Sequence, residues 1–202
     1  MIVRALAMLL LLMGGCVHAV GGNGAASGPF TPAAREAAAQ RVRFAAEAVC
    51  LNNRTRDAQD RAARQAGFTA RERQPDGSVV YSNLGVLTFL RLERVPAQTF
   101  SQPDGSPGQV SAGPGCLVGS PAVDTRTANR LVGEILAPRL IEGDQRVSAP
   151  VGSGENDSRG VGFFFEDLSV TVPLDGVTTV VDGASGRERT FVHSMILVVH
   201  DR

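Results

Sequence analysis

Two histidines near the C-terminus are the first residues whose type and spacing could support chemistry. His193 and His200 both lie in the apolar run Phe191–His200. Side chains alternate between the two faces of an extended strand, so a separation of seven places the imidazoles on opposite faces. They are then unable to bind one metal ion together. His193 could still act as a base beside an acid such as Glu166 or Asp167, as in a hydrolase, although a histidine within a strand is more often structural.

A serine nucleophile has one imperfect candidate. The segment Gly183-Ala184-Ser185-Gly186 approaches the elbow on which hydrolases carry their serine, but Arg187 stands where the closing glycine belongs. It also joins two predicted strands, whereas the elbow joins a strand to a helix. The carboxylates of Glu166 and Asp167 are adjacent in the chain and would diverge in a strand. The sequence therefore predicts no coherent catalytic set, no metal site and no cofactor.

The N-terminus has the layout of an export signal. Arg4 is followed by nine apolar residues, Ala5 to Met13, and then by Gly14-Gly15-Cys16. The apolar run is too short to cross a bilayer as a helix, which takes about 20 residues. A positive residue, a short apolar core and small residues together predict a signal peptide that is removed after export. The rest of the chain is then expected to fold outside the cytoplasm.

The end of this signal resembles a known processing site. Met13-Gly14-Gly15-Cys16 is similar to the lipobox of bacterial lipoproteins, with Met13 where that family usually carries leucine. The resemblance implies a signal peptide over residues 1–15 and a lipid on Cys16, which becomes the mature N-terminus. It also implies a periplasmic protein anchored to an envelope membrane, with the outer membrane as the expected one. The alternative is ordinary cleavage after Val17-His18-Ala19.

A spacer is expected between the anchor and the folded part. Residues 16–30 include the glycine-rich stretch Val20–Pro29, which has almost nothing to bury and predicts a flexible tether. A domain held at a membrane requires such a spacer, and this favours the lipoprotein interpretation. The remaining residues, 31–202, are enough for one domain with a hydrophobic core.

Export also decides the expected state of the cysteines. Once Cys16 is lipidated or removed with the signal, Cys50 and Cys116 remain. An even pair in an oxidising compartment is most simply a disulfide. Such a bond would close a loop of about 65 residues and stabilise the fold by about 4 kcal/mol in the chain-entropy treatment. The two cysteines do not form a CxxC motif, so the sequence gives no indication of redox chemistry.

Charge composition narrows the classes of partner. The chain holds 20 basic and 20 acidic residues, so it lacks the basic excess typical of nucleic-acid-binding proteins. Every basic residue is arginine, which excludes a lysine nucleophile. The densest basic group could face anionic lipid or polysaccharide, but pairing with the protein's own acids or simple solvation is the favoured interpretation. It consists of Arg54, Arg56, Arg61 and Arg64.

Three helices are predicted from caps and apolar spacing. The first starts with Thr31 as N-cap and Pro32 in the first turn, and ends near Cys50 before Asn52-Asn53. The second runs from an Asp57 cap to Ala66, with Gly67 ending it and Phe68 packing after it. Its predicted inner face consists of Ala58, Ala62 and Ala66. The third runs from an Asp124 cap to Leu136, where Pro138 should stop it. Its predicted buried face consists of Ala128, Leu131, Val132, Ile135 and Leu136.

Strands and turns make up the rest of the predicted domain. QPDGS occurs at 74–78 and again at 102–106, and Pro-Asp-Gly is turn chemistry. Strands are expected at 79–82, 86–92, 116–118, 161–165, 168–172 and 177–181, with turns at Asp175-Gly176 and Asp182-Gly183. The run 191–200 should be a central strand because it is apolar nearly throughout. Loops are expected at 105–115 and at about 142–162.

These observations predict an α+β fold, in which helices pack on one face of an antiparallel sheet behind a flexible N-terminal tether. The leading functional hypothesis is an exported envelope lipoprotein, with a non-enzymatic interaction or structural module favoured over an enzyme. Its expected contacts are the membrane, through the N-terminal lipid, and an envelope protein or cell-wall component. The alternative is a periplasmic hydrolase or small-ligand-binding protein.

Overall fold

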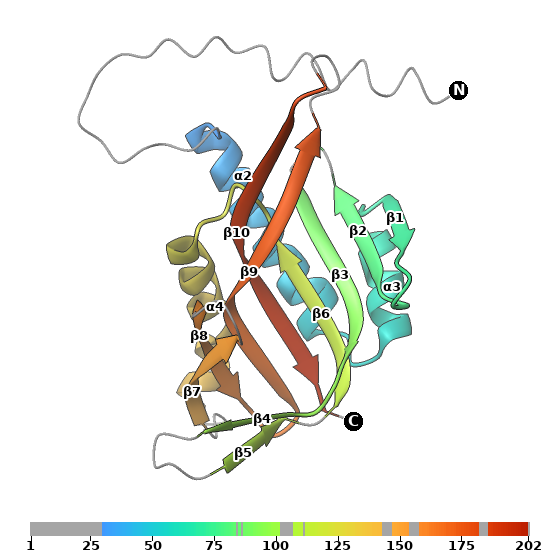
Figure 1. Cartoon of the computed structure of the whole chain (residues 1–202). Coiled ribbons are helices and arrows are strands. Elements are labelled where there is room, and N and C mark those ends of the chain that lie inside the picture. The colour runs from blue at the N-terminus through green and yellow to red at the C-terminus, as the bar shows by residue number, and fades with distance from the viewer. Residues whose placement is uncertain are drawn as a thin grey trace, which may run out of the picture.

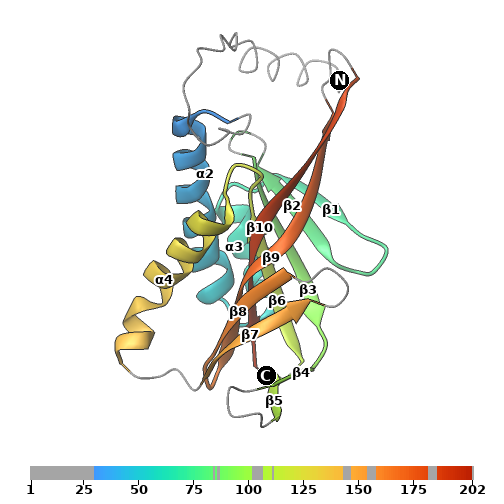
Figure 2. The same ribbon diagram turned by 60° about the vertical axis from the view of Figure 1, so that its left-hand side comes forward.

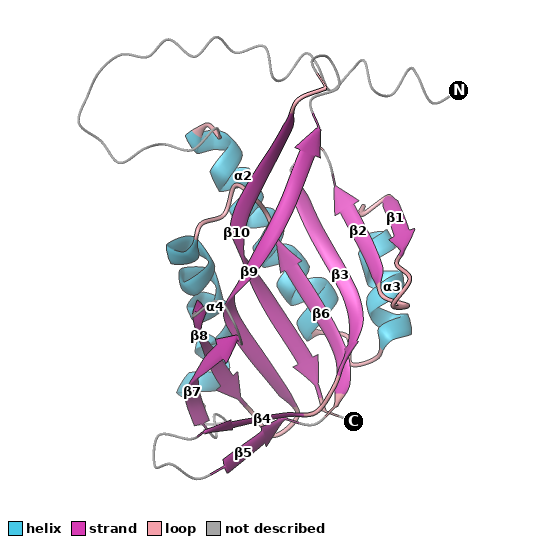
Figure 3. Ribbon diagram, in the orientation of Figure 1, coloured by secondary structure: helices cyan, strands magenta, loops and turns pink. Residues whose placement is uncertain are grey.

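Helices cover one face of an antiparallel sheet, which confirms the predicted α+β class (Figure 1). The structure is a computed structural model, and it describes residues 30–83, 85, 87–101, 107–110, 112–142, 147–153, 158–181 and 186–201. The predicted signal, Cys16 and all but the last residue of the predicted tether lie outside these ranges. In Figure 2 the helical layer stands on one side of the sheet, and Figure 3 separates the two kinds of element by colour.

The sheet has eight strands, and every neighbouring pair is antiparallel. In spatial order they are β1 (Ala70–Arg73), β2 (Val79–Asn83), β3 (Thr88–Val95), β6 (Gly113–Gly119), β10 (Glu188–His200), β9 (Leu168–Val181), β8 (Ser158–Phe164) and β7 (Val147–Ser153). A separate two-stranded ribbon joins β4 (Gln98–Ser101) to β5 (Pro107–Val110). The predicted central strand is β10, and it lies inside the sheet, between β6 and β9.

The helical layer begins with one long, two-part helix. α2 (Pro32–Ala45) has the predicted Thr31 cap, whose hydroxyl accepts a hydrogen bond from the Ala34 amide at 3.2 Å. It continues without a break into η2 (Ala46–Leu51), a segment of π-helix. At the C-terminal end of this π-helical segment, the Asn53 side-chain amide donates hydrogen bonds to the carbonyls of Ala48 and Val49, at 2.8 and 3.1 Å. These bonds satisfy carbonyls that a helix end leaves without partners.

The second helix starts two residues earlier than predicted. α3 (Arg56–Gln65) is capped by Thr55, whose hydroxyl accepts from the Ala58 amide, so Asp57 falls in the first turn. Threonine and aspartate are both good caps, and the sequence alone did not separate them. The buried positions are accordingly Gln59 and Ala63, flanked by the alanines predicted to be the inner face.

The end of α3 follows the prediction closely. Gly67 has φ of +79°, the left-handed conformation that glycine adopts most easily after a helix. The amides of Gly67 and Phe68 donate back to the carbonyls of Arg64 and Ala63, and the Phe68 ring is buried.

The first QPDGS segment forms the predicted turn. Gly77 has φ of +80°, and the Asp76 side chain accepts a hydrogen bond from the Ser78 amide. The second QPDGS segment lies outside the described residues.

The third helix is longer than predicted. α4 (Thr125–Ile141) begins at the expected Asp124 cap, but Pro138 lies inside its last turns instead of ending it. Proline removes one helical hydrogen bond, yet its own carbonyl still accepts from the Glu142 amide at 3.1 Å. Four of the five predicted apolar positions are buried, namely Ala128, Leu131, Val132 and Leu136. Ile135 is only partly buried.

Three segments predicted as loops or turns are strands. The glycine-rich stretch 105–115 includes β5 and the start of β6, and the polar stretch 142–162 includes β7 and most of β8. Asp175-Gly176 lies within β9, paired with β10, so it is not a turn. In each case the backbone forms a hydrogen-bonded ladder with a neighbouring strand, and that ladder is made by backbone N–H and C=O groups. The turn expected at Asp182-Gly183 lies outside the described residues.

The core lies between the sheet and the helical layer. Its central rungs cross three strands, with Leu92 and Val198 on either side of Cys116, and Leu90 and Ile196 on either side of Val118. All six are essentially inaccessible to solvent. Helical residues packed in the same cluster are Val42, Val49, Leu131 and Leu136. No helix within the described ranges is long and apolar enough to span a membrane.

Two contacts attach η2 to the middle of the sheet. Cys50 on η2 is disulfide-bonded to Cys116 on β6, which confirms the predicted pairing, and their Cα atoms are 5.3 Å apart. The His200 side chain on β10 donates from Nε2 to the backbone carbonyl of Cys50 at 2.7 Å. The π-helical turn is therefore held from β6 and from β10 at the same residue, and this fixes the residues that follow it.

Candidate functional site

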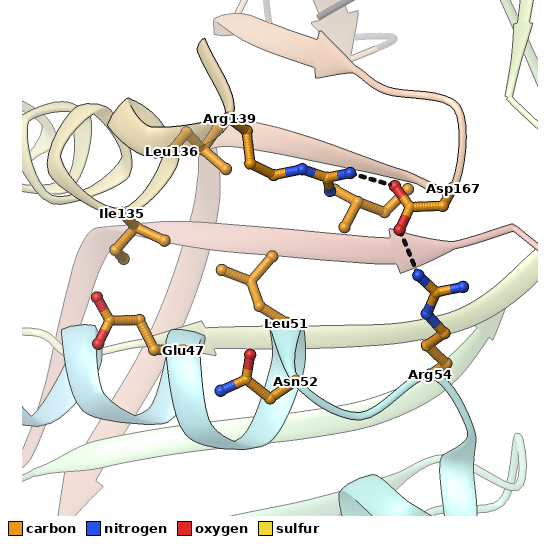
Figure 4. A pocket seen from close by; sticks show the side chains of 9 residues that line it. Glu47, Leu51, Asn52, Arg54, Ile135, Leu136, Arg139 and Asp167 are labelled. Atoms are coloured by element: carbon orange, nitrogen blue, oxygen red, sulfur yellow. Dashed lines mark hydrogen bonds and ion pairs between the residues drawn. The ribbon is translucent and has the colours of Figure 1, made fainter. Parts of the chain in front are cut away.

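A cleft opens beside the C-terminal end of η2. It has a volume of about 360 Å³ and lies between η2, the second half of α4 and the turn that connects β8 to β9 (Figure 4). Its apolar lining consists of Leu51, Ile135, Leu136 and Leu168, and its polar lining of Glu47, Asn52, Arg54, Arg139 and Asp167. Ligand sites are usually lined mostly by apolar side chains, and this cleft is more polar, since five of its nine lining residues are polar.

One carboxylate bound by two guanidinium groups dominates this cleft. Asp167 Oδ1 accepts from Arg139 Nη2 at 2.6 Å, and its Oδ2 accepts from Arg54 Nη2 at 2.7 Å. The three residues come from the turn before β9, the last turns of α4 and the connection between η2 and α3. The backbone carbonyl of Asp167 also accepts from the Asp201 amide at 2.9 Å, which fixes the turn against the end of β10.

The local charges keep this carboxylate ionised. Burial alone would raise the pKa of Asp167, but the hydrogen bond from Arg139 and the charges of Arg139 and Arg54 outweigh burial and lower the pKa below its ordinary value. The Arg139 guanidinium also lies over the Phe165 ring, 4.6 Å from its centre, and this cation–π contact fixes its position.

An acidic group lies on the other side of the cleft. In Figure 4, Glu47 and the Arg54–Asp167 pair lie on opposite sides of Leu51. Glu47 forms an ion pair with Arg43 at 3.2 Å, and Arg43 also contacts Glu134 at 3.0 Å. These side chains are largely exposed, and exposed pairs contribute only about 0–1 kcal/mol, so a ligand could compete for Glu47.

The two histidines lie on opposite faces of the sheet, as predicted. His200 faces the helical layer, where it binds the Cys50 carbonyl. Ser194 faces the same layer, because its hydroxyl is 2.7 Å from that of Thr125 on α4, so the preceding His193 lies on the other face. Burial lowers the pKa of His193, and a hydrogen bond with the Ser194 backbone only partly offsets this.

The proposed partners of His193 lie far from it. Asp167 is next to Asp201 at the C-terminal end of β10, whereas His193 lies eight residues before Asp201. At about 3.3 Å per residue, the separation along the strand is about 25 Å. The structure therefore does not assemble an acid–base pair from His193 and Asp167, or from His193 and the neighbouring Glu166. Ser185 lies outside the described residues.

The dense arginine group is largely paired within the protein, as favoured from the sequence. Arg54 binds Asp167, Arg64 binds Asp60, and Arg56 donates to the carbonyl of Gly77. The sequence did not indicate that Arg54 lines a cleft. Residues 140–202 hold ten acids and five arginines, which indicates acidic partners in the C-terminal part of the chain, but charge balance does not specify which residues meet.

The Asp167 cluster predicts a measurable pH dependence. Its pKa is lower in the folded state, so its stabilising effect is present above the unfolded value of about 3.9 and is lost as pH falls through the folded value. We expect Asp167→Asn to lower the free energy of unfolding by about 1 kcal/mol at pH 7, and by much less near pH 3. Urea unfolding at both pH values measures this.

The control is Glu72→Gln, on the exposed strand β1, which should leave the difference between the two pH values unchanged. If the free energy of unfolding of Asp167→Asn changed between pH 7 and pH 3 by as much as that of the wild type, the cluster would not contribute as described.

Within the described ranges, no group of three or more histidine, cysteine, aspartate or glutamate side chains is arranged to hold a metal ion. Searches of family models, curated proteins and solved structures found no match to this chain.

Proposed function

We propose that this protein is an exported bacterial envelope lipoprotein whose α+β domain is a non-enzymatic binding module. In this proposal residues 1–15 are a signal peptide, Cys16 carries the lipid, and residues 16–30 tether the domain to a periplasmic membrane surface. The domain then contacts an envelope protein or a cell-wall component.

The disulfide is the observation that carries the proposal. Cys50 and Cys116 are bonded at the centre of the fold. Stable disulfides form in oxidising compartments such as the periplasm and are rare in the cytosol. A bond buried between the helical layer and the sheet therefore supports folding after export, which is what the N-terminal signal predicts independently.

The cleft favours binding over hydrolysis. A general base works best with a pKa near the working pH, whereas the two arginines lower the pKa of Asp167 and make it a weak base. His193 lies on the opposite face of the sheet, about 25 Å away along β10. The second candidate, a small-ligand-binding protein, is favoured by the cleft itself, which has a volume within the range of ligand pockets.

Replacing the proposed lipid-bearing residue tests the anchor. We expect Cys16→Ser to move most of the protein from the membrane fraction to the soluble fraction of the cell envelope, because acyl chains supply the membrane affinity. Ala19→Arg is the matched control, since it disrupts the alternative cleavage site and should leave the protein on the membrane. Lipidation would be contradicted if Cys16→Ser had the same distribution between the two fractions as the wild type and Ala19→Arg accumulated as uncleaved precursor.

A further inference from the structure

We propose that the cleft binds the C-terminal end of a short peptide whose last side chain is apolar. The peptide carboxylate would bind Arg54, the apolar side chain would pack on Leu51 and Ile135, and a peptide N–H or ammonium group would face Glu47. This assigns a ligand class to the binding module described above, and to that extent it rests on the proposed function.

Arg54 is suited to receive a carboxylate. A guanidinium carries five N–H donors in a planar fork, and the contact of Arg54 with Asp167 engages only Nη2. The Arg54 side chain is 69% exposed at the rim of the cleft, so a ligand can reach its remaining donors. Asp167 holds this guanidinium in place, and a second carboxylate would bind its remaining donors.

The apolar lining explains why the ligand should be more than a carboxylate. Leu51 and Ile135 are the two apolar lining residues that remain partly accessible beside Arg54, because Leu136 and Leu168 are buried. A hydrophobic group placed there would leave water while the carboxylate stays at the rim. A volume of about 360 Å³ lies near the lower end of the range for small-molecule pockets, about 300–1,000 Å³. It fits one apolar side chain and the adjoining peptide groups.

The opposite rim favours a peptide over a fatty acid. Glu47 lies on the far side of Leu51 from Arg54, and Asn52 lies below Leu51, between Glu47 and Arg54 (Figure 4). A carboxylate and an amide can bind N–H donors, which a peptide has and a fatty acid lacks. The order of groups across the cleft is therefore acid, apolar surface and guanidinium. A short peptide presents the complementary order, with nitrogen, side chain and carboxylate.

Titration of the mature protein with three small probes tests the ligand class. The probes are the dipeptide Gly-Leu, its C-terminal amide and hexanoate. The binding of each probe is measured by isothermal titration calorimetry or by changes in NMR chemical shift. We expect saturable binding of Gly-Leu, with the amide at least about tenfold weaker, because hydrogen bonds to charged groups are strong. Hexanoate should bind more weakly than Gly-Leu. Equal binding of Gly-Leu and its amide would overturn the proposal, and tighter binding of hexanoate would assign the cleft to fatty acids.

Variants locate the site. Arg54→Gln should weaken Gly-Leu binding about tenfold, whereas Arg61→Gln, an exposed arginine on α3 outside the cleft, should not. Glu47→Gln should weaken Gly-Leu binding but leave hexanoate unchanged. Wild-type affinity in Arg54→Gln, or no saturable response at about 10 mM Gly-Leu, would reject the site. If the protein is lipidated but shows either of these results, the peptide site is rejected and the lipid anchor is retained. Failure of the peptide proposal is therefore distinguishable from failure of the proposed function.

Discussion

Replacement of both Cys50 and Cys116 by alanine is expected to lower the free energy of unfolding by about 4 kcal/mol. The bond joins residues 66 positions apart, and a cross-link over that distance removes much of the conformational freedom of the unfolded chain. Domains are typically stable by only about 5–15 kcal/mol, so the loss is a large share of the total. We expect the variant to be only marginally folded.

Urea unfolding of the double variant, followed by circular dichroism, measures this effect. Wild-type protein with its disulfide reduced is the matched control and should unfold at nearly the same denaturant concentration as the variant. A loss of less than about 1 kcal/mol would show that the contacts of η2, including the His200 bond to the Cys50 carbonyl, hold the layer without the cross-link.

Substitution of Gly113 by alanine is expected to destabilise the protein by about 3 kcal/mol, the upper part of the range for overpacking. A Cβ at Gly113 would overlap the backbone carbonyl oxygen of His200 and approach its carbonyl carbon to 3.1 Å. Backbone in a central strand moves less easily than a side chain, and His200 is also the residue that holds Cys50. The substitution should therefore disturb β6, β10 and η2 together.

Gly133 provides a control with the opposite sign. It lies on the exposed side of α4, and a Cβ built there has nothing within 4 Å. Alanine is the better helix former by about 0.8–1.0 kcal/mol, so Gly133→Ala should raise stability by about that amount. Thermal unfolding of both variants checks the pair. If Gly113→Ala were as stable as the wild type, the close approach of β6 to the end of β10 would not exist in solution.

Features that depend on one residue and its near neighbours could be predicted from the sequence. The Thr31 and Asp124 caps and the Gly67 helix end each follow from local hydrogen bonding or from backbone sterics. The opposite orientations of His193 and His200 follow from the alternation of side chains along a strand. The fold class follows from the order of these elements along the chain.

Features that depend on pairing across the sheet could not be predicted in the same way. β7, the first residues of β8 and part of β6 contain glycine and polar residues, and their signal resembles that of a loop, whereas the strand predicted at 161–165 overlaps the rest of β8. They are strands because neighbouring strands supply hydrogen bonds to their backbones. The length of α4 past Pro138 depends similarly on its surroundings, since proline in isolation predicts a helix end.

The candidate site required the tertiary structure. Arg54, Arg139 and Asp167 meet although they are separated by 28 residues or more, and none belongs to a recognisable motif. Their meeting depends on the disulfide, which fixes the end of η2, and on α4 continuing past Pro138 to place Arg139. The sequence predicted the first of these conditions and missed the second.

The intact mass of the mature protein, purified from its native envelope, tests the central claim most directly. Export with lipidation predicts a chain that begins at Cys16, carries acyl groups, and lacks two hydrogens because Cys50 and Cys116 are bonded. A chain that still begins at Met1, with both thiols reduced, would contradict the account.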